Sequence, residues 1–361
     1  MLRILVENDI PAVVALFARV YPRHRWSCAT EWESYFHATL FDNPWRDPEV
    51  PSWVVEDGGH ITGFYAVLPR QMLWKGRLIR VAVGCQFMVD PDQRHSLTAL
   101  QMVQACIAGP QDLTLADAAS DQARRMWTSV GGTTALLYSL QWTRPLRPAA
   151  YALSLARERT ALPRPVAQAA RPLAAVIDTL AARLRPNRFH GDDEDVADEA
   201  LDAATMQAGL AAMLEGSALR PLYDARSLAW LLDQVSRKTS YGNLHTRVVR
   251  DDQSRILGWY LCYLRAGAIG EVIQIAARRD AYDRVLRRLL VDAWRRGATA
   301  VRGRVDPRFA RELSDRHCWS RWDGAWTLAH SRDPAIVAAI QQGDAFFSRL
   351  EGEWWLRFMG A

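Results

Sequence analysis

One junction between a strand and a helix most constrains the fold of this chain. The segment from Val89 to Leu100 reads Val-Asp-Pro-Asp-Gln-Arg-His-Ser-Leu-Thr-Ala-Leu, which predicts the end of a buried strand, a tight turn and the first turn of a helix. The first amides of a helix lack intrahelical partners and lie at the positive end of its dipole. The junction therefore predicts a strand–helix unit with a site for a phosphate or pyrophosphate group.

This junction resembles the acyl-CoA loop of the GNAT superfamily of N-acyltransferases, in which V-x-P-x-x-R-x-x-G-x-G/A ends strand four and begins the next helix. Val89, Pro91, Arg94 and Ala99 match the pattern, and Leu97 replaces its first glycine. Glycine lets the backbone approach a pyrophosphate, so Leu97 either blocks that approach or turns outward. The resemblance implies that acetyl-CoA or another acyl-CoA binds here, to Met88, Val89, Arg94, His95, Ser96, Leu97, Thr98, Ala99 and, from the next helix, Trp127.

A second motif follows at the separation that the same family shows. Leu113–Ala116 predicts a short buried strand, and Ser120–Val130 predicts a helix that Gly131 and Gly132 end. Residues 120–132 resemble the family's N-x-x-A-x-x-L-Y-x-x-x-G-F helix, with Trp127 where the tyrosine is usual. Two linked motifs favour the GNAT fold more strongly than either motif alone.

The remaining pattern of strands and helices predicts two similar lobes. Residues 2–21 predict a strand and an amphipathic helix, and residues 53–67 predict a hairpin. Residues 247–261 repeat this hairpin, and strand, helix, strand and helix then follow between residues 271 and 316. Residues 41–45, Phe-Asp-Asn-Pro-Trp, are also similar to GNAT members of bacterial polysaccharide and secondary-metabolite pathways.

We therefore expect an α/β protein with two GNAT-like lobes, each a mixed, mostly antiparallel sheet flanked by helices. The predicted division is an acyl-CoA-binding domain at 1–147, a helical and acidic linker at 148–219, and a degenerate GNAT-like domain at 220–361. The degenerate domain carries arginines where the first has its loop, and they form either a solvated basic helix face or a site for anionic groups across the cleft. These arginines are Arg278, Arg279, Arg284, Arg287 and Arg288.

Composition limits the partners. The chain has 361 residues, 49% of them hydrophobic, which suffices for two packed cores. Its net charge is +5, but the basic residues are interleaved with acidic ones, which argues against nucleic acid and permits a small anion such as coenzyme A. The five cysteines show no metal-binding spacing, and the sequence shows neither a leader peptide nor a membrane-spanning run. We expect a cytoplasmic protein without a bound metal.

The catalytic residues are harder to predict than the cofactor loop. The resemblance implies a strand-four acid as base and a tyrosine that protonates the departing thiolate, but Cys85 and Gln86 occupy the first position and Trp127 the second. Asp117 is either a base acting through water or a capping carboxylate. Cys85 is either an acyl-accepting nucleophile or a buried core residue.

Two more candidates lie at the predicted acceptor side. His37, next to Trp32, Tyr35 and Phe36, is either the base or a residue of the helix surface. Tyr138 either lines the cleft or is a half-buried strand aromatic. The aromatic residues between 346 and 358 either pack between the lobes or roof an acceptor pocket.

The predicted reaction is transfer of an acyl group, expected to be acetyl, to a primary amine of a small metabolite, amino sugar or amino acid. Two alternatives stay open. One is a transferase that resembles the Fem proteins, which pair two GNAT-like lobes and take an aminoacyl group from transfer RNA. The other is a non-catalytic GNAT scaffold that binds a ligand or a protein partner.

Overall fold

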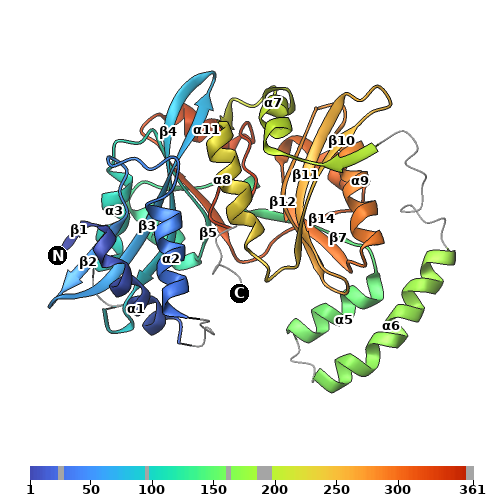
Figure 1. Ribbon diagram of the computed structural model, residues 1–361, viewed down its shortest axis with the longest axis horizontal. Coiled ribbons are helices and arrows are strands. Elements are labelled where there is room, and N and C mark those ends of the chain that lie inside the picture. The colour runs from blue at the N-terminus through green and yellow to red at the C-terminus, as the bar shows by residue number, and fades with distance from the viewer. Residues whose placement is uncertain (23–27, 94–96, 160–163, 185–196, 355–361) are drawn as a thin grey trace.

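The computed structural model describes residues 1–22, 28–93, 97–159, 164–184 and 197–354, and contains two mixed sheets with helices around them (Figure 1). This is the α/β class with two sheets that the sequence predicts. We call the parts built on the two sheets the first lobe and the second lobe. No helix among the described residues is long and apolar enough to cross a membrane.

The first sheet has the strand order β1-β2-β3-β4-β5-β15-β6, and β9 pairs with β3. Its strands are antiparallel except for the parallel pair β4–β5. The predicted hairpin joins β2 to β3 through Gly58 and Gly59, whose φ values of 56° and 80° suit glycine. The strands are β1 (Leu2–Ile4), β2 (Trp53–Asp57), β3 (His60–Trp74), β4 (Arg77–Val89), β5 (Leu113–Ala119), β6 (Thr133–Thr134), β9 (Leu219–Pro221) and β15 (Trp326–His330).

The second sheet has the strand order β14-β7-β13-β12-β11-β10-β8, and its parallel pair is β12–β13. The near-continuous apolar burial of β11 and β12 follows from their central position, since both faces are covered. The strands are β7 (Leu140–Pro145), β8 (Ala197–Ala200), β10 (Asn243–Arg250), β11 (Ile256–Leu264), β12 (Ile269–Ala277), β13 (Ala300–Arg304) and β14 (Trp319–Trp322).

Helices flank both sheets, and α5 and α6 form a hairpin that stands out from the second lobe (Figure 1). Local chemistry sets several of their starts. Ser120 accepts a hydrogen bond from the amide of Ala123 and so begins α4, and Asp224 forms a capping box with Ser227 at α8. The helices are α1 (Ile10–Val20), α2 (Ala29–Leu40), α3 (Thr98–Ile107), α4 (Asp121–Ser129), α5 (Pro148–Arg159), α6 (Arg164–Leu184), α7 (Ala203–Met213), α8 (Ala225–Ser236), α9 (Tyr282–Arg295), α10 (Ala310–Asp315) and α11 (Pro334–Gln341).

The two lobes exchange strands. β7 comes from the first half of the chain but pairs with β13 and β14 in the second sheet. β15 comes from the second half but pairs with β5 and β6 in the first sheet. The sheets therefore do not divide at residues 147 and 220, and the domain limits given above stay a prediction.

The lobes also share a core. One hydrophobic cluster contains Phe64 and Leu68 of the first sheet together with Trp259 and Ile273 of the second. Residues 345–354, which we call the C-terminal segment, run through this interior, and residues 345–353 are all buried. A buried segment outside helices and strands must pair its backbone with nearby groups, and this requirement shapes the site described next.

Candidate functional site

A gap between β4 and β5 is the central feature of the first lobe. The two parallel strands pair only from Val81 to Val83 with Leu113 to Leu115, although β4 runs on to Val89 and β5 to Ala119. Beyond this short ladder, no strand among the described residues pairs with the facing edges of β4 and β5. We call this opening the β4–β5 gap.

A β-bulge turns one backbone amide into this gap. The register between β3 and β4 shifts so that Ala66 faces Cys85 and Phe64 faces Met88, and Gln86 has a φ of 50°. The amide of Gln86 donates to the Glu353 carboxylate at 3.2 Å instead of joining the ladder. An amide released from a sheet in this way is a donor that can polarise a carbonyl oxygen.

The second lobe repeats this arrangement. Its parallel strands pair only from Ile269 to Glu271 with Ala300 to Arg302, and a register shift in β12 leaves Ile273 as a bulge. Here the C-terminal segment lies in the opening, where the Arg349 amide donates to the Ile273 carbonyl at 2.9 Å. The remaining cavity, about 20 Å³, has room for about one water molecule.

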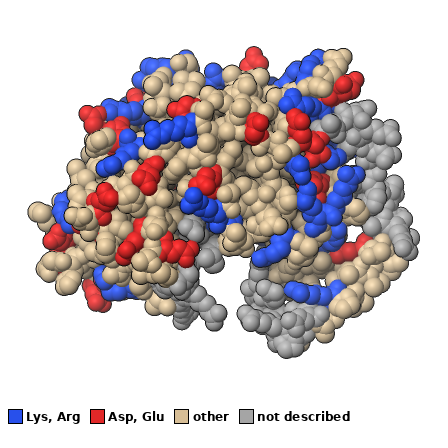
Figure 2. All heavy atoms as spheres, viewed as in Figure 1, with Lys and Arg blue, Asp and Glu red and all other residues tan. Residues whose placement is uncertain are grey.

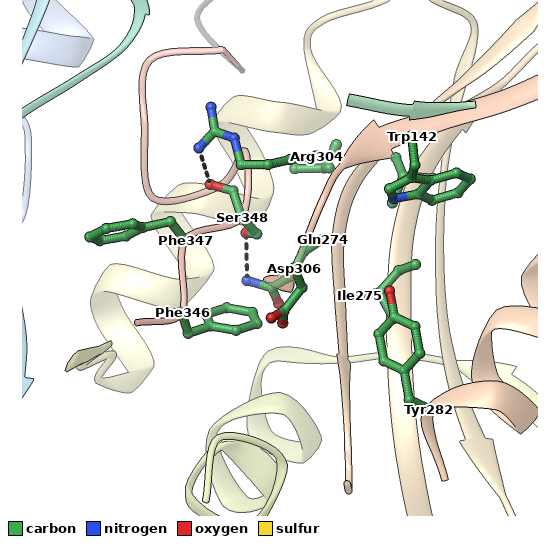
Figure 3. A pocket seen from close by; sticks show the side chains of 11 residues that line it. Trp142, Gln274, Ile275, Tyr282, Arg304, Asp306, Phe346, Phe347 and Ser348 are labelled. Atoms are coloured by element: carbon green, nitrogen blue, oxygen red, sulfur yellow. Dashed lines mark hydrogen bonds between the residues drawn. The ribbon is translucent and has the colours of Figure 1, made fainter. Parts of the chain in front are cut away.

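Figure 3 shows this cavity with Trp142 and Tyr282 on one side and Phe346 on the other. The Gln274 side chain donates to the Ser348 hydroxyl at 3.2 Å, and Arg304 donates to the Ser348 carbonyl at 3.3 Å. Arg304 continues past the cavity to the end of β5 in the first lobe. It thus connects the cavity of the second lobe to the β4–β5 gap.

At the gap, Arg304 meets the buried carboxylate of Asp117. Its guanidinium donates to the Asp117 carboxylate at 2.8 Å, and both side chains are about 5% exposed or less. The other carboxylate oxygen of Asp117 accepts from the Glu353 amide at 2.6 Å. A Cβ on Gly352 would lie 1.9 Å from the Asp117 Oδ2, so the C-terminal segment packs flush against this carboxylate only because residue 352 is glycine.

The Glu353 carboxylate is the most perturbed acid of this cluster. Burial and the neighbouring Asp117 charge raise the pKa of Glu353 to about 8, while hydrogen bonds from the Gln86 and Ala118 amides act in the opposite direction. A carboxyl group that titrates near neutral pH in a buried cluster is typical of acid–base chemistry. Purely structural ion-pair networks also perturb pKa values, so the position of Glu353 at the β4–β5 gap is the evidence that bears on its role.

The predicted cofactor loop lies next to this gap. Arg94, His95 and Ser96 fall outside the described residues. Leu97 is 69% exposed, so it turns outward and does not close the space in front of α3. Thr98 begins α3 and is buried, Ala99 is half-buried, and Met88, Val89 and Trp127 contribute to the two apolar clusters beneath the loop.

The four predicted catalytic residues do not all lie at one site. Asp117 lies at the gap, and Cys85 lies beside it in β4 as a buried thiol whose pKa is raised well above its usual value, mainly by burial. His37 lies on the surface between Glu7 and Asp42, which raise its pKa. The Tyr138 hydroxyl donates to the Ala345 carbonyl at 2.6 Å and so holds the start of the C-terminal segment.

Three residues of the cluster have no counterpart among the sequence candidates: Gln86 as an amide donor, Arg304 and Glu353. In the sequence, Glu353 stands within a run of aromatic residues that is expected either to pack between the lobes or to roof an acceptor pocket. Among these aromatic residues, the Trp354 ring stacks on Tyr241 with centroids 5.0 Å apart.

Part of the arginine set of the second lobe is paired with nearby acids. Arg278 contacts Asp280, and Arg288 contacts Asp198. Figure 2 shows acidic and basic side chains interspersed over the face in view. The side chain of Arg278 is 41% exposed and that of Arg288 is 16% exposed, so the first is solvated and the second is largely buried.

The fold is that of the GCN5-related N-acetyltransferases. A probable N-acyltransferase from Enterococcus faecalis matches with a TM-score of 0.60 at 9% identity, over 95% of this chain and 73% of its own. An N-acetyltransferase of this class from Kribbella flavida matches with a TM-score of 0.58 at 14% identity, over 94% and 74%. A third, from Anabaena variabilis, matches with a TM-score of 0.58 at 11% identity, over 91% and 72%.

No protein-family model matches the sequence, and no curated protein matches it. The likeness to these structures establishes the fold, and chemistry must be argued from the site.

Proposed function

We propose that this protein transfers an acyl group, expected to be acetyl, from acyl-CoA to a primary amine of a small metabolite, amino sugar or amino acid. The observation that carries the proposal is the β4–β5 gap, into which a bulge turns the Gln86 amide. Acyl transfer needs a donor at the carbonyl oxygen, and this amide is positioned before any ligand binds. The repeated gap and bulge in the second lobe support a tandem duplication of the fold.

The residues present fit an acyl-CoA. The start of α3 offers backbone amides and the positive end of a helix dipole for the pyrophosphate, and the outward Leu97 leaves that approach open. The free edges of β4 and β5 suit the amides of the pantetheine arm. Bound acyl-CoA supplies an activated carbonyl; the chain supplies the donor, the apolar walls and the buried carboxylates.

A calorimetric titration tests the proposal. We expect acetyl-CoA to bind saturably with micromolar affinity, and the Arg94→Glu variant to lose at least tenfold in affinity, about 1.4 kcal/mol, because a like charge replaces a pyrophosphate partner. The matched control is Arg311→Glu, which makes the same change at a residue of α10 whose side chain is 90% exposed.

Turnover is then measured with a panel of primary amines. Unchanged affinity of Arg94→Glu would remove the loop from the proposal. Absence of both heat and thermal stabilisation at millimolar acetyl-CoA would refute acyl-CoA binding altogether. Tight binding without any acylation of the panel would favour a non-catalytic scaffold.

A further inference from the structure

Strand β4 has no acid on the stretch that borders the gap, which reads Gly-Cys-Gln-Phe-Met-Val over residues 84–89. An amine acylation nevertheless needs a base near the attacking nitrogen. We propose that Glu353 of the C-terminal segment is this general base, supplied to β4 from the opposite end of the chain. The inference rests on the proposed acyl transfer and names a catalytic residue for it.

Position supports this role. The Glu353 carboxylate lies on the bulge amide of Gln86, at 3.2 Å, and also on the Ala118 amide across the gap. It therefore bridges β4 and β5 at the point where the strands diverge. Asp117 fixes the backbone of Glu353 through the 2.6 Å hydrogen bond to its amide, so Asp117 acts as a positioning residue.

The hydrogen bonds also leave the carboxylate free to share the site with an acyl group. Its bond to Gln86 is long for a charge-assisted hydrogen bond, which is usually near 2.8 Å. If an acyl carbonyl takes the Gln86 amide, the Ala118 amide still holds Glu353 beside the reacting atoms. The side chain of Gln86 in turn donates to the Tyr35 hydroxyl at 2.7 Å, which ties the bulge to α2.

The groups around Glu353 keep its proton affinity high. Asp117 adds a negative charge, and Arg304 balances that charge at Asp117. Among the described residues, the other titratable neighbours are phenols and a thiol that are neutral near pH 7. These neighbours are Tyr21 of the segment after α1, Tyr65 of β3 and Cys85 of β4. A carboxylate in this setting accepts a proton from an ammonium group more readily than a solvated glutamate does.

The proposed step moves one proton of the substrate ammonium to Glu353 and a second one to the departing sulfur. The Glu353 carboxylate takes one proton from the substrate ammonium, and the freed nitrogen attacks the thioester carbon. The C–N bond forms, the C–S bond breaks, and the sulfur leaves with the electron pair as a thiolate. The second nitrogen proton passes to this thiolate, which leaves as the thiol, and Glu353 returns its own proton to solvent.

The test is the Glu353→Gln variant, assayed with acetyl-CoA and the best amine found for the wild type. We expect kcat to fall by about 10²- to 10⁴-fold, the loss typical of a general base. The acetyl-CoA Kd should stay within about twofold, and the limb of the pH–rate profile near pH 8 should disappear. Glu353→Asp should recover part of the rate, since it restores a carboxylate.

Two further variants separate chemistry from packing. Gly352→Ala keeps Glu353 but sets a Cβ against Asp117, so it should displace the carboxylate and lower kcat as Glu353→Gln does. Glu351→Gln is the matched control: it lies in the same buried segment, but its carboxylate accepts from Tyr223 and Ser348. It should keep the wild-type pH profile.

A readout without substrate completes the test. Because the pKa of Glu353 is raised from 4.5 to about 8 in the folded protein, the folded state holds a proton that the unfolded state has lost across this window. Wild-type stability should therefore fall relative to Glu353→Gln as the pH rises from about 5 to 8, as measured by urea unfolding.

Different results would overturn the inference in different ways. Unchanged kcat and pH profile in Glu353→Gln would exclude the base role while leaving acyl transfer intact. A higher acetyl-CoA affinity with undiminished kcat, in both Glu353→Gln and Gly352→Ala, would make the segment an inhibitory plug. A wild type that neither binds acetyl-CoA nor acylates amines would refute the proposed function itself.

Discussion

Buried charges are the feature of this protein that matters most at the scale of single residues. Glu271 accepts from Arg349 at 2.8 Å and from Arg302 at 2.5 Å, and Lys238 lies nearby with its ammonium 5.2 Å from the Tyr241 ring centre. The two arginine side chains already outweigh the negative charge of Glu271, and Lys238 adds a further positive charge. Burial lowers the pKa of Lys238 to about 7.

The Lys238→Met variant tests how much the burial of this ammonium group lowers the stability of the folded protein. Unfolded Lys238 keeps its proton up to about pH 10.5, whereas folded Lys238 loses it above about pH 7. The wild type should therefore gain stability between pH 7 and 10, because its unfolded state binds more protons there. Lys238→Met should be more stable than the wild type at pH 6, with the difference shrinking toward pH 10 in urea titrations. A difference that does not change with pH would contradict the assignment.

A double-mutant cycle tests the ion pair between Asp117 and Arg304. Arg304→Met leaves the Asp117 carboxylate buried without its cation and should cost about 3–5 kcal/mol of unfolding free energy. The double variant with Asp117→Asn should recover part of that loss, since no uncompensated charge remains. Guanidinium unfolding of all four proteins gives the coupling, and additive effects would show that the pair is not coupled.

At the scale of elements, periodicity and turn chemistry predicted much of the fold. The sequence predicts a strand, a helix, a strand and a helix between residues 271 and 316, where the structure has β12 (Ile269–Ala277), α9 (Tyr282–Arg295), β13 (Ala300–Arg304) and α10 (Ala310–Asp315). These elements carry strong local patterns, such as the buried Val285, Leu286 and Leu289 on one face of α9. Strand exchange was not predicted, because β7 and β15 carry no local mark of the sheet that they join.

The candidate site could be predicted only in part. Asp117 was found because it ends a predicted strand, and the loop before α3 was found through its motif. Glu353 was missed because its partners Asp117 and Gln86 lie 236 and 267 residues earlier, and a pattern within one segment cannot reveal such a contact. Arg304 was missed for the same reason, since its role depends on a strand of the other lobe.

At the scale of the whole molecule, the exchanged strands make the two halves depend on each other. Residues 1–190 include β7 without its partners β13 and β14, and they lack β15 between β5 and β6. An unpaired strand edge exposes backbone groups that favour aggregation. Neither half should form a stable sheet by itself.

Cutting the chain between residues 190 and 191 tests this dependence. Co-expressed fragments 1–190 and 191–361 should purify together and unfold in one cooperative transition, whereas each fragment alone should be insoluble or lack near-UV circular dichroism. A second fragment that ends at residue 322 keeps β14 but lacks β15, and it should fail to rescue the first. Cooperative unfolding of 1–190 alone would show that the halves are independent.

The position of Glu353 along the chain sets an order of events during synthesis. The residues of β4 and β5 leave the ribosome long before β15 and residue 353 do, so the first sheet and the partner of the Gln86 amide both depend on later parts of the chain. Contacts over such sequence separations form slowly, because the entropy cost of closing a long loop comes before the contacts can stabilise the structure. A nascent chain in which β15 and residue 353 have not yet emerged therefore lacks both a complete first sheet and the proposed base, so acylation is expected only after both have emerged.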